Sequence, residues 1–303
     1  MRTETGPPPR GNAPDSGGPL PGFVFDPSDP WTLVFQEGLA MSGLNGANVY
    51  EVGVGSGANA VHMLEKCGAR LVSGSDLDAR LPLLAQRVVE RDAPGLRDRF
   101  RPVLGSVDLI GTPEAAAAVS GADAVVGCLP QVPDPLDDRC ARFCAAFLGE
   151  DARGGSRADD YIAHYYPWTR FASMPYNAVG LGLIEALLRQ VRSCAPRAQA
   201  VFNLGCRVGR EALFAVFRAN GYRPVELTSR IVPQSECTDI GFFAALEEAS
   251  RGAGGERGIV CEFYADPQGR SPLTAAEAKR ALDADPAAPV FHEVCVVRGT
   301  PAT

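Results

Sequence analysis

Three glycines at alternate positions follow a β-rich run near residue 50. The segment reads Glu51-Val-Gly53-Val-Gly55-Ser-Gly57 and is followed by a helical pattern. Glycine allows a sharp backbone turn and leaves main-chain N–H groups open to a ligand, because no Cβ covers them. Asp76 ends the next β-rich run, where a carboxylate can accept hydrogen bonds from ribose hydroxyls. The spacing predicts a site for an adenosine-containing cofactor.

A loop that begins Gly105-Ser-Val-Asp108 follows the third β-rich run, and we expect Asp108 to contact an adenine edge. Two alternatives remain open at this point. One is a strand–helix turn with no ligand. The other is a nicotinamide dinucleotide, since Gly53-x-Gly55-x-x-Ala58 also satisfies G-x-G-x-x-G/A. The acid two residues before Gly53, and the third glycine two residues after Gly55, argue against the dinucleotide.

The pattern E-x-G-x-G-x-G resembles motif I of class I S-adenosylmethionine (SAM) methyltransferases. Upstream, residues 24–34 (VFDPSDPWTLV) are similar to a segment of methyltransferases with an N-P-P-Y motif, where it closes over the methionine end of SAM. On its own this segment predicts a turn followed by a helix start. The resemblance implies SAM as cofactor and the following cofactor-binding residues: Pro27, Thr32, Glu51, Gly53, Gly55, Gly57, Asp76 and Asp108.

The segment after the fourth β-rich run occupies the position of the N-P-P-Y motif. It reads Cys128-Leu-Pro130-Gln131-Val-Pro-Asp-Pro, so a cysteine stands where that family has its asparagine. Residues 127–135 instead resemble the G-C-I-P-Q segment in the methyltransferase domain of methionine S-methyltransferase. We expect Cys128, Pro130 and Gln131 to line the site of methyl transfer. A nucleophilic role for Cys128 is not expected, because methyl transfer from SAM is direct and no His or Asp spacing supports covalent catalysis.

The resemblance to methionine S-methyltransferase covers residues 23–298. Further blocks are GLGLI (180–184), FNLGCRVGR (202–210), and GYRPV (221–225) with TDI (238–240). It implies a small, amino-acid-like methyl acceptor, first a methionine-type thioether sulfur. The sequence does not include the large aminotransferase-like portion of that family, so an amine, amide or guanidine nitrogen of a small metabolite is the alternative acceptor. Outside this class, an NAD(P)-dependent oxidoreductase and a non-catalytic SAM-binding protein are the alternatives.

Five aromatic residues lie within positions 161–171, far above the 8% average of the chain. Aromatic faces stabilise sulfonium and ammonium groups by cation–π attraction, although packing of the rings on the sheet is equally compatible. His164 lies among them and is a candidate base for an amine acceptor, with a packing role as the alternative. Arg207 could bind an acceptor carboxylate and Asn203 its amino group, or both could brace the loop. The predicted substrate-binding residues are Tyr161, His164, Tyr165, Tyr166, Asn203 and Arg207.

These residues require a parallel sheet to bring the strand ends together. Short β-rich runs alternate with helical patterns from residue 49 to residue 229, which predicts an α/β fold with a Rossmann-like methyltransferase sheet and helices on both faces. Residues 1–21 are expected to be a disordered tail, 22–250 the methyltransferase domain with a substrate-binding insertion at 136–179, and 251–303 a C-terminal α/β appendage packed on that domain. A helix over TAAEAKRAL (274–282) is predicted to start at Ser271 or Thr274.

The charge and composition of the chain argue against several further classes of function. The net charge of −7 argues against a general nucleic-acid binder, and no apolar run is long enough for a membrane span. Nine dispersed cysteines without a C-x-x-C pair, and only three histidines, offer little for a disulfide framework or a metal site. We therefore expect a cytoplasmic protein with a small-molecule substrate and no metal. The sequence does not decide the oligomeric state, for which a homodimer is one option.

Overall fold

The first described helix of the computed structural model, α1 (Pro30–Met41), has clear start signals. The structure describes residues 28–106, 108–131, 174–234, 240–252 and 260–302. Asp29 caps α1 by accepting a hydrogen bond from the Thr32 N–H at 2.9 Å, and Pro30 occupies the first helical position. None of the helices in these residues is long and apolar enough to cross a membrane.

Five parallel strands form one half of the central sheet. They are β1 (Asn48–Val52), β2 (Leu71–Asp76), β3 (Phe100–Leu104), β4 (Ala124–Gly127) and β5 (Gln199–Gly205). The connecting elements described are α2 (Ala58–Glu65), α3 (Arg80–Asp92), η2 (Pro94–Arg99), α4 (Pro113–Ser120), η5 (Pro175–Val179) and α7 (Gly182–Cys194). Their spatial order is β3-β2-β1-β4-β5. The strand order reverses beside β1, so the ligand crevice belongs at the carboxyl ends of β1 and β4.

Antiparallel strands complete the sheet. Strand β9 (Phe291–Pro301) lies between β5 and β6 (Tyr222–Pro233) and is antiparallel to both. Two short strands, β7 (Phe263–Tyr264) and β8 (Pro272–Leu273), extend the sheet beyond β9. Residues 291–301 belong to the segment 251–303 that is predicted to form an appendage, whereas β9 is an inner strand of the central sheet. Strand patterns show that a segment is extended, but they do not identify its partners.

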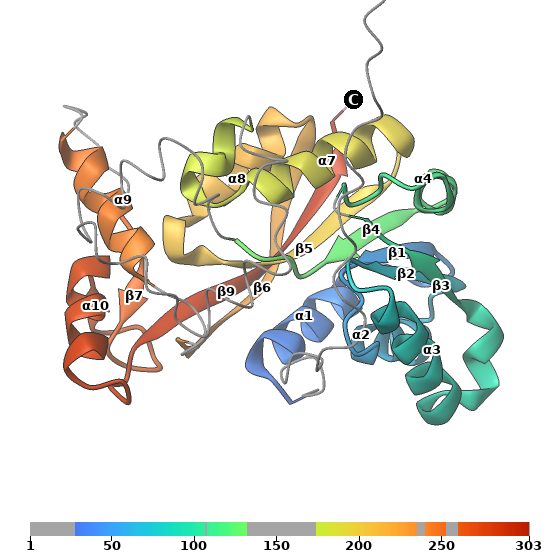
Figure 1. The fold of residues 1–303 in the computed structure, drawn as a ribbon, viewed down its shortest axis with the longest axis horizontal. Coiled ribbons are helices and arrows are strands. Elements are labelled where there is room, and N and C mark those ends of the chain that lie inside the picture. The colour runs from blue at the N-terminus through green and yellow to red at the C-terminus, as the bar shows by residue number, and fades with distance from the viewer. Residues whose placement is uncertain (1–27, 107, 132–173, 235–239, 253–259, 303) are drawn as a thin grey trace, which may run out of the picture.

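Helices cover both faces of this sheet (Figure 1). Helices α1, α2 and α3 pack on one face, over a core that includes Phe35, Met63 and Val294. Helices α7 and α8 (Arg210–Ala219) pack on the other, over a core that includes Leu187 and Phe217. Alternate residues of β9 contribute to the cores on the two faces of the sheet. Val294 and Val296 face α1, while Cys295 and Val297 face α8. The expected Rossmann-like α/β fold class is confirmed.

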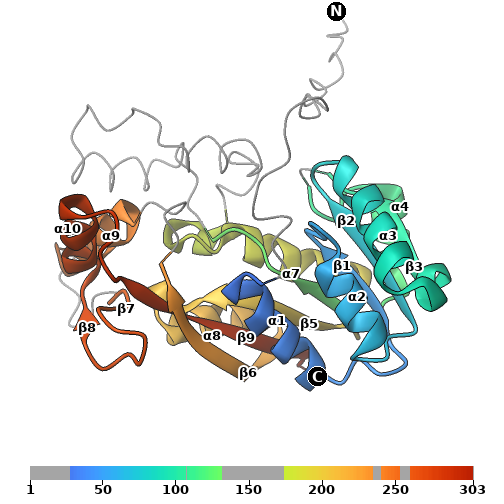
Figure 2. The same cartoon turned by 90° about the horizontal axis from the view of Figure 1, so that it is seen from below.

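Helices α9 (Gly241–Gly252) and α10 (Ala275–Ala284) stand at the opposite end of the molecule from α2 and α3 (Figures 1 and 2). Thr274 is the N-cap of α10 and forms a capping box with Glu277. Of the two predicted start residues, Ser271 and Thr274, the second is therefore the correct one. The buried Glu247 carboxylate of α9 accepts hydrogen bonds from the N–H groups of Cys261 and Ala275, at 2.9 and 3.2 Å. One carboxylate thus fixes α9, the adjoining loop and α10 together.

Candidate active site

The glycine-rich bend closes β1 and opens α2. All three glycines adopt left-handed backbone conformations, with φ of +76° at Gly53, +53° at Gly55 and +83° at Gly57. A Cβ on Gly57 would lie 2.6 Å from the Ala85 Cα, so Gly57 permits close packing of α2 on α3. No heavy atom lies within 4 Å of the Cβ position of Gly55, which is the open part of the bend.

Asp76 lies directly beside this bend. Its Oδ2 accepts a hydrogen bond from the Gly55 N–H at 3.0 Å. Desolvation raises the pKa of Asp76 to about 6, although three backbone N–H groups act in the opposite direction. The loop after β3 passes close by, since a Cβ on Gly105 would lie 2.2 Å from the Asp76 carbonyl oxygen, and the half-buried Asp108 follows in the same loop. The bend, Asp76 and the loop of Asp108 are therefore neighbours, as the sequence spacing predicts.

Glu51 adds a second carboxyl group to the cradle. It is 1% exposed, and its Oε2 atom has no hydrogen-bond partner. Burial raises the pKa of Glu51 to about 8; the Asn59 side chain lowers it and the Asp76 charge raises it further. No Lys or Arg of the described residues forms an ion pair with Glu51 or Asp76, and Arg80, four residues after Asp76, is paired with Asp78. Within the described part of the chain, the cradle therefore holds two carboxyl groups and no cation paired with either.

The start of α1 lies at the carboxyl edge of the sheet. The Asn203 side chain, at the end of β5, donates a hydrogen bond through Nδ2 to the Trp31 carbonyl at 2.9 Å. Thr32 is held close to this contact, but its hydroxyl donates to Asp29 at 3.3 Å, within the helix cap. The helix-start interpretation of this segment is thus correct, and the same contact keeps Thr32 near the predicted site. Pro27 lies outside the described residues.

The loop after β4 reaches across to β5. Gln131 hydrogen-bonds with both backbone groups of Gly205: its Oε1 accepts from the N–H at 2.6 Å and its Nε2 donates to the carbonyl at 3.2 Å. Both ends of the Gln131 amide are therefore used to fix the loop that carries half-buried Pro130. Cys128, exposed in this loop, receives a hydrogen bond from the Asn203 side chain at 3.5 Å.

Asn203 and Arg207 are both buried at the end of β5. Asn203 keeps an unpartnered Oδ1, although its Nδ2 is engaged. Arg207 lies in η6 (Cys206–Val208) among residues that the sequence reasoning missed: Trp31, Gln234, Phe243 and His292. The scarcity of histidine and the position of Trp31 beside Thr32 were the only available signals, because these contacts join distant parts of the chain.

Several predicted substrate residues lie outside the described residues. These are Tyr161, His164, Tyr165 and Tyr166, together with positions 136–173 of the expected insertion. Its last part is described: residues 175–179 form η5, which Glu185 of α7 holds by accepting a hydrogen bond from the Tyr176 N–H at 2.9 Å. Among the described residues, no group of His, Cys, Asp and Glu side chains could hold a metal ion.

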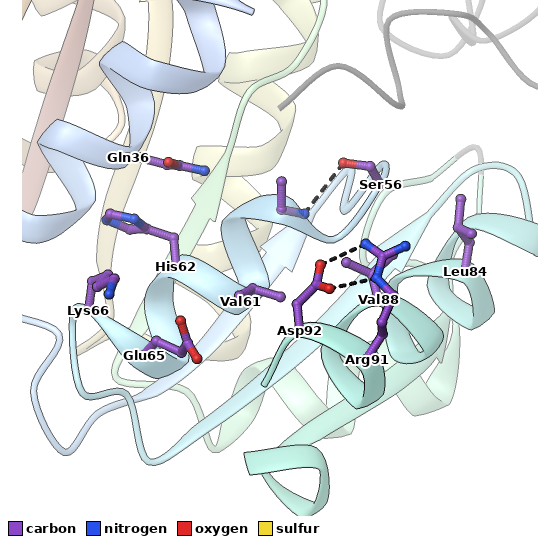
Figure 3. Close-up of a pocket in the computed structure, with 11 residues that line it drawn as sticks. Gln36, Ser56, Val61, His62, Glu65, Lys66, Leu84, Val88, Arg91 and Asp92 are labelled. Atoms are coloured by element: carbon purple, nitrogen blue, oxygen red, sulfur yellow. Dashed lines mark hydrogen bonds and ion pairs between the residues drawn. The ribbon is translucent and has the colours of Figure 1, made fainter. Parts of the chain in front are cut away.

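A separate hollow of about 500 Å³ lies between α2 and α3, with Gln36 of α1 at one side (Figure 3). Its wall mixes both signs of charge, with Glu65 at the end of α2, Lys66 directly after it, and Arg91 paired to Asp92 on α3. The hollow touches the outer side of the bend at Ser56 and Ala58. It lies on the helices rather than at the strand ends, and therefore differs from the site described above.

No protein-family model and no curated protein sequence matches the chain. Many solved structures are similar at low identity. A putative methyltransferase from Bacillus halodurans C-125 is 8% identical with a TM-score of 0.46, over 89% of this chain and 99% of that one. A putative RNA methyltransferase from Pyrococcus horikoshii is 9% identical with a TM-score of 0.42, over 92% and 86%. A putative sarcosine dimethylglycine methyltransferase from Galdieria sulphuraria is 12% identical with a TM-score of 0.41, over 88% and 85%. At these values the structures assign no family or substrate.

Proposed function

We propose that the protein is a SAM-dependent methyltransferase that acts on a small, amino-acid-like acceptor. The observation that carries the proposal is the acidic cradle at the glycine-rich bend. SAM has a sulfonium and an ammonium group, and the negative charge of the cradle favours such a cation. At neutral pH that charge resides on Asp76, whose pKa is about 6, whereas Glu51, with a pKa of about 8, is largely protonated. A dinucleotide would instead place its anionic pyrophosphate against these carboxyl groups, with the Gly55 N–H already donating to Asp76. The charge of the cradle therefore favours SAM over NAD(P).

The residues of the bend fit an adenosyl ligand. The space over Gly55 is open, and the buried Glu51 Oε2 lacks a partner that a bound donor group could supply. We assign the ribose hydroxyls to Asp76, the adenine edge to Asp108, and the methionine end to the start of α1 near Thr32. When bound, SAM supplies an electrophilic methyl group. The task of the chain is then to align the acceptor and to exclude water.

We place the acceptor at the ends of β4 and β5. Cys128 and Pro130 line this side, Gln131 fixes the loop, and the unpartnered Oδ1 of Asn203 can accept a hydrogen bond from an amino group. Arg207 is the candidate partner of a carboxylate. A methionine-type thioether sulfur is the first acceptor, because sulfur carries no proton and the described residues supply no evident base. A nitrogen acceptor is the second, with His164 as its candidate base.

Titration calorimetry with SAM, S-adenosylhomocysteine and NAD tests the cofactor class. We expect binding of the first two and none of NAD; binding of NAD alone would overturn the proposal. Incubation with SAM and L-methionine, L-arginine or other amino acids, followed by mass spectrometry, then distinguishes sulfur from nitrogen acceptors. SAM binding without methylation of any small molecule in the panel would favour the non-catalytic alternative.

A further inference from the structure

Arg207 is a buried cation whose partners in the described part of the chain are all neutral. Its Nε donates to Gln234 Oε1 at 3.0 Å, and its Nη2 donates to His292 Nε2 at 2.9 Å. The rings of Trp31 and Phe243 lie 5.5 and 5.7 Å from its guanidinium carbon. Among the described residues, no carboxylate forms an ion pair with it. The charge is therefore held in place by hydrogen bonds and aromatic faces, without compensation.

Arg210, three residues later, shows that carboxylates are available nearby. It is more exposed than Arg207, yet it pairs with both Glu226 at 2.8 Å and Glu293 at 2.5 Å. Leaving a buried charge unpaired is costly, and desolvation lowers the pKa of Arg207 to about 10. Such a charge is stabilised when a ligand brings the missing counter-charge.

The partners of Arg207 also determine which of its guanidinium nitrogens remains free to bind a ligand. Desolvation and the Arg207 charge hold the pKa of His292 well below its usual range, so the ring is neutral. Its Nε2 accepts from Arg207, hence the proton resides on Nδ1, which is buried and without a partner. Gln234 and His292 occupy Nε and Nη2, while Nη1 donates to none of the residues described.

Nη1 lies at a narrow crevice on the acceptor side of the site, too tight in this structure to hold a water molecule. A Cβ on Gly205 would be 3.1 Å from Arg207 Nη1, 3.1 Å from Trp31 Cη2 and 3.5 Å from Gln131 Oε1. The crevice is lined by Gln131, Val179, Gly205, Arg207, Val208 and Phe243. The free edge of the guanidinium thus faces the same loop that carries Pro130.

We propose that Arg207 binds a ligand carboxylate through Nη1, and that Gln234 and His292 are positioning residues whose neutrality reserves its charge for that ligand. The inference rests on the proposed function, in which the site holds SAM and an amino-acid-like acceptor. Either molecule can supply the carboxylate: the acceptor through its own carboxyl group, or SAM through its methionine end.

The first test needs no ligand. In Gln234→Glu the new carboxylate pairs with Arg207, so we expect the melting temperature of the full chain to rise by a few degrees. Gln199→Glu, the same change at the start of β5, is the matched control and should give no rise. A melting temperature that changes by the same amount in Gln234→Glu and in Gln199→Glu would show that the new carboxylate gains nothing from Arg207, and would contradict an uncompensated charge there.

The second test compares ligands with and without a carboxylate by calorimetry on the full chain. The pairs are L-methionine with L-methioninol, L-arginine with L-argininol, and SAM with decarboxylated SAM. We expect at least tenfold tighter binding of the carboxylate member in one pair, which also identifies the source. Gln234→Glu should abolish this preference. Gly205→Ala, whose backbone φ of −77° suits alanine, should weaken the same ligand, because the new Cβ would lie 3.1 Å from Arg207 Nη1.

The outcomes separate this inference from the proposed function. If neither SAM nor S-adenosylhomocysteine binds, the proposed function fails. If SAM binds but no pair shows a preference for its carboxylate member, the function stands and the carboxylate site is wrong. If a preference exists and persists unchanged in Gln234→Glu, the carboxylate lies elsewhere and the positioning role of Gln234 is wrong.

Discussion

Asp76 and Glu51 share one cradle, and the Asp76 charge raises the pKa of Glu51, while desolvation and then the Asp78 charge raise that of Asp76. Ribose hydroxyls donate best to an ionised carboxylate, so binding must keep Asp76 deprotonated. The pKa of Asp76 is raised from its ordinary value to about 6 in the ligand-free protein. Above that value the carboxylate is ready to bind. Below it, binding must first remove a proton.

We therefore predict that the affinity for SAM is highest above about pH 7 and falls as the pH drops through 6, by up to about tenfold per pH unit. Calorimetry between pH 5 and 8 measures this. Asp76→Asn should bind SAM weakly at every pH and should not show the fall in affinity near pH 6. Glu51→Gln should still show that fall. A wild-type affinity that is flat from pH 5 to 7 would contradict the assignment of the ribose to Asp76.

Asp76→Ala should cost SAM about 1.5–3 kcal/mol of binding free energy at pH 7.5, or roughly 10–100-fold in Kd, because a charged acceptor is lost. The matched variant is Asp123→Ala, at the opposite edge of the sheet, where Asp123 accepts from the Asn48 N–H. That control should leave SAM affinity unchanged. Equal affinity in Asp76→Ala and wild type would show that the carboxylate is not a ligand.

At the scale of elements, the glycine-rich bend has two roles that its sequence does not separate. Gly55 is open to a ligand, whereas Gly57 lies against Ala85 of α3. Gly43 provides a comparison, since its φ is +76° and nothing lies within 4 Å of its Cβ position. Gly43 and Gly57 share the cost that a side chain pays in a left-handed conformation, but only at Gly57 would the new Cβ also contact a neighbouring helix.

Gly57→Ala should accordingly lower the free energy of unfolding by about 2–5 kcal/mol, the sum of left-handed strain and overpacking. Gly43→Ala should lower it by only about 1–2 kcal/mol. Urea denaturation of both variants measures the difference. Equal losses would mean that α2 can shift away from α3 without cost, and that the contact does not constrain the bend.

The loop after β4 is likewise fixed by one side chain. Replacing Gln131 by Leu keeps the size of the side chain but leaves both Gly205 backbone groups without their partner, so we expect a loss of about 1–3 kcal/mol in unfolding free energy. Gln86→Leu removes a surface hydrogen bond to Glu90 and should change stability by less than about 0.5 kcal/mol. Unfolding curves of the pair test this, and equal stabilities would contradict the anchoring role.

At the scale of the whole molecule, the last strand, β9, is needed to complete the central sheet and its core. Strand β9 pairs with β5 and β6 and contributes to the cores on both faces. A peripheral appendage could be removed without loss of the central domain. An inner strand cannot, because β5 and β6 do not pair with one another.

Truncation after residue 290 should therefore abolish cooperative unfolding and SAM binding. Removal of residues 302 and 303 alone, beyond the end of β9, should preserve both. Circular dichroism melts and calorimetry on the two truncations provide the measurement. A truncated chain that still melts cooperatively and binds SAM would show that the parallel half folds by itself.

Several features of this protein are encoded by residues that are neighbours in the chain. The left-handed glycines before α2, the acid that ends β2, and the alternation of strands and helices from 49 to 229 each depend on residues close together in the chain. Local conformation and periodicity are set by such neighbours, so the cradle and the parallel half of the sheet could be predicted. The same reasoning singled out Asn203, near the end of a predicted strand, and Arg207, just after it, as candidates.

Only the tertiary structure decided what surrounds those residues. The contact of Arg207 with His292 joins positions 85 residues apart, and that of Asn203 with Trp31 joins positions 172 apart. The insertion of β9 beside β5, and the use of Gln131 to fix its loop, also depend on packing between distant segments. No local pattern encodes such pairs, because their energy is realised only when the sheet has formed and burial removes water from each contact.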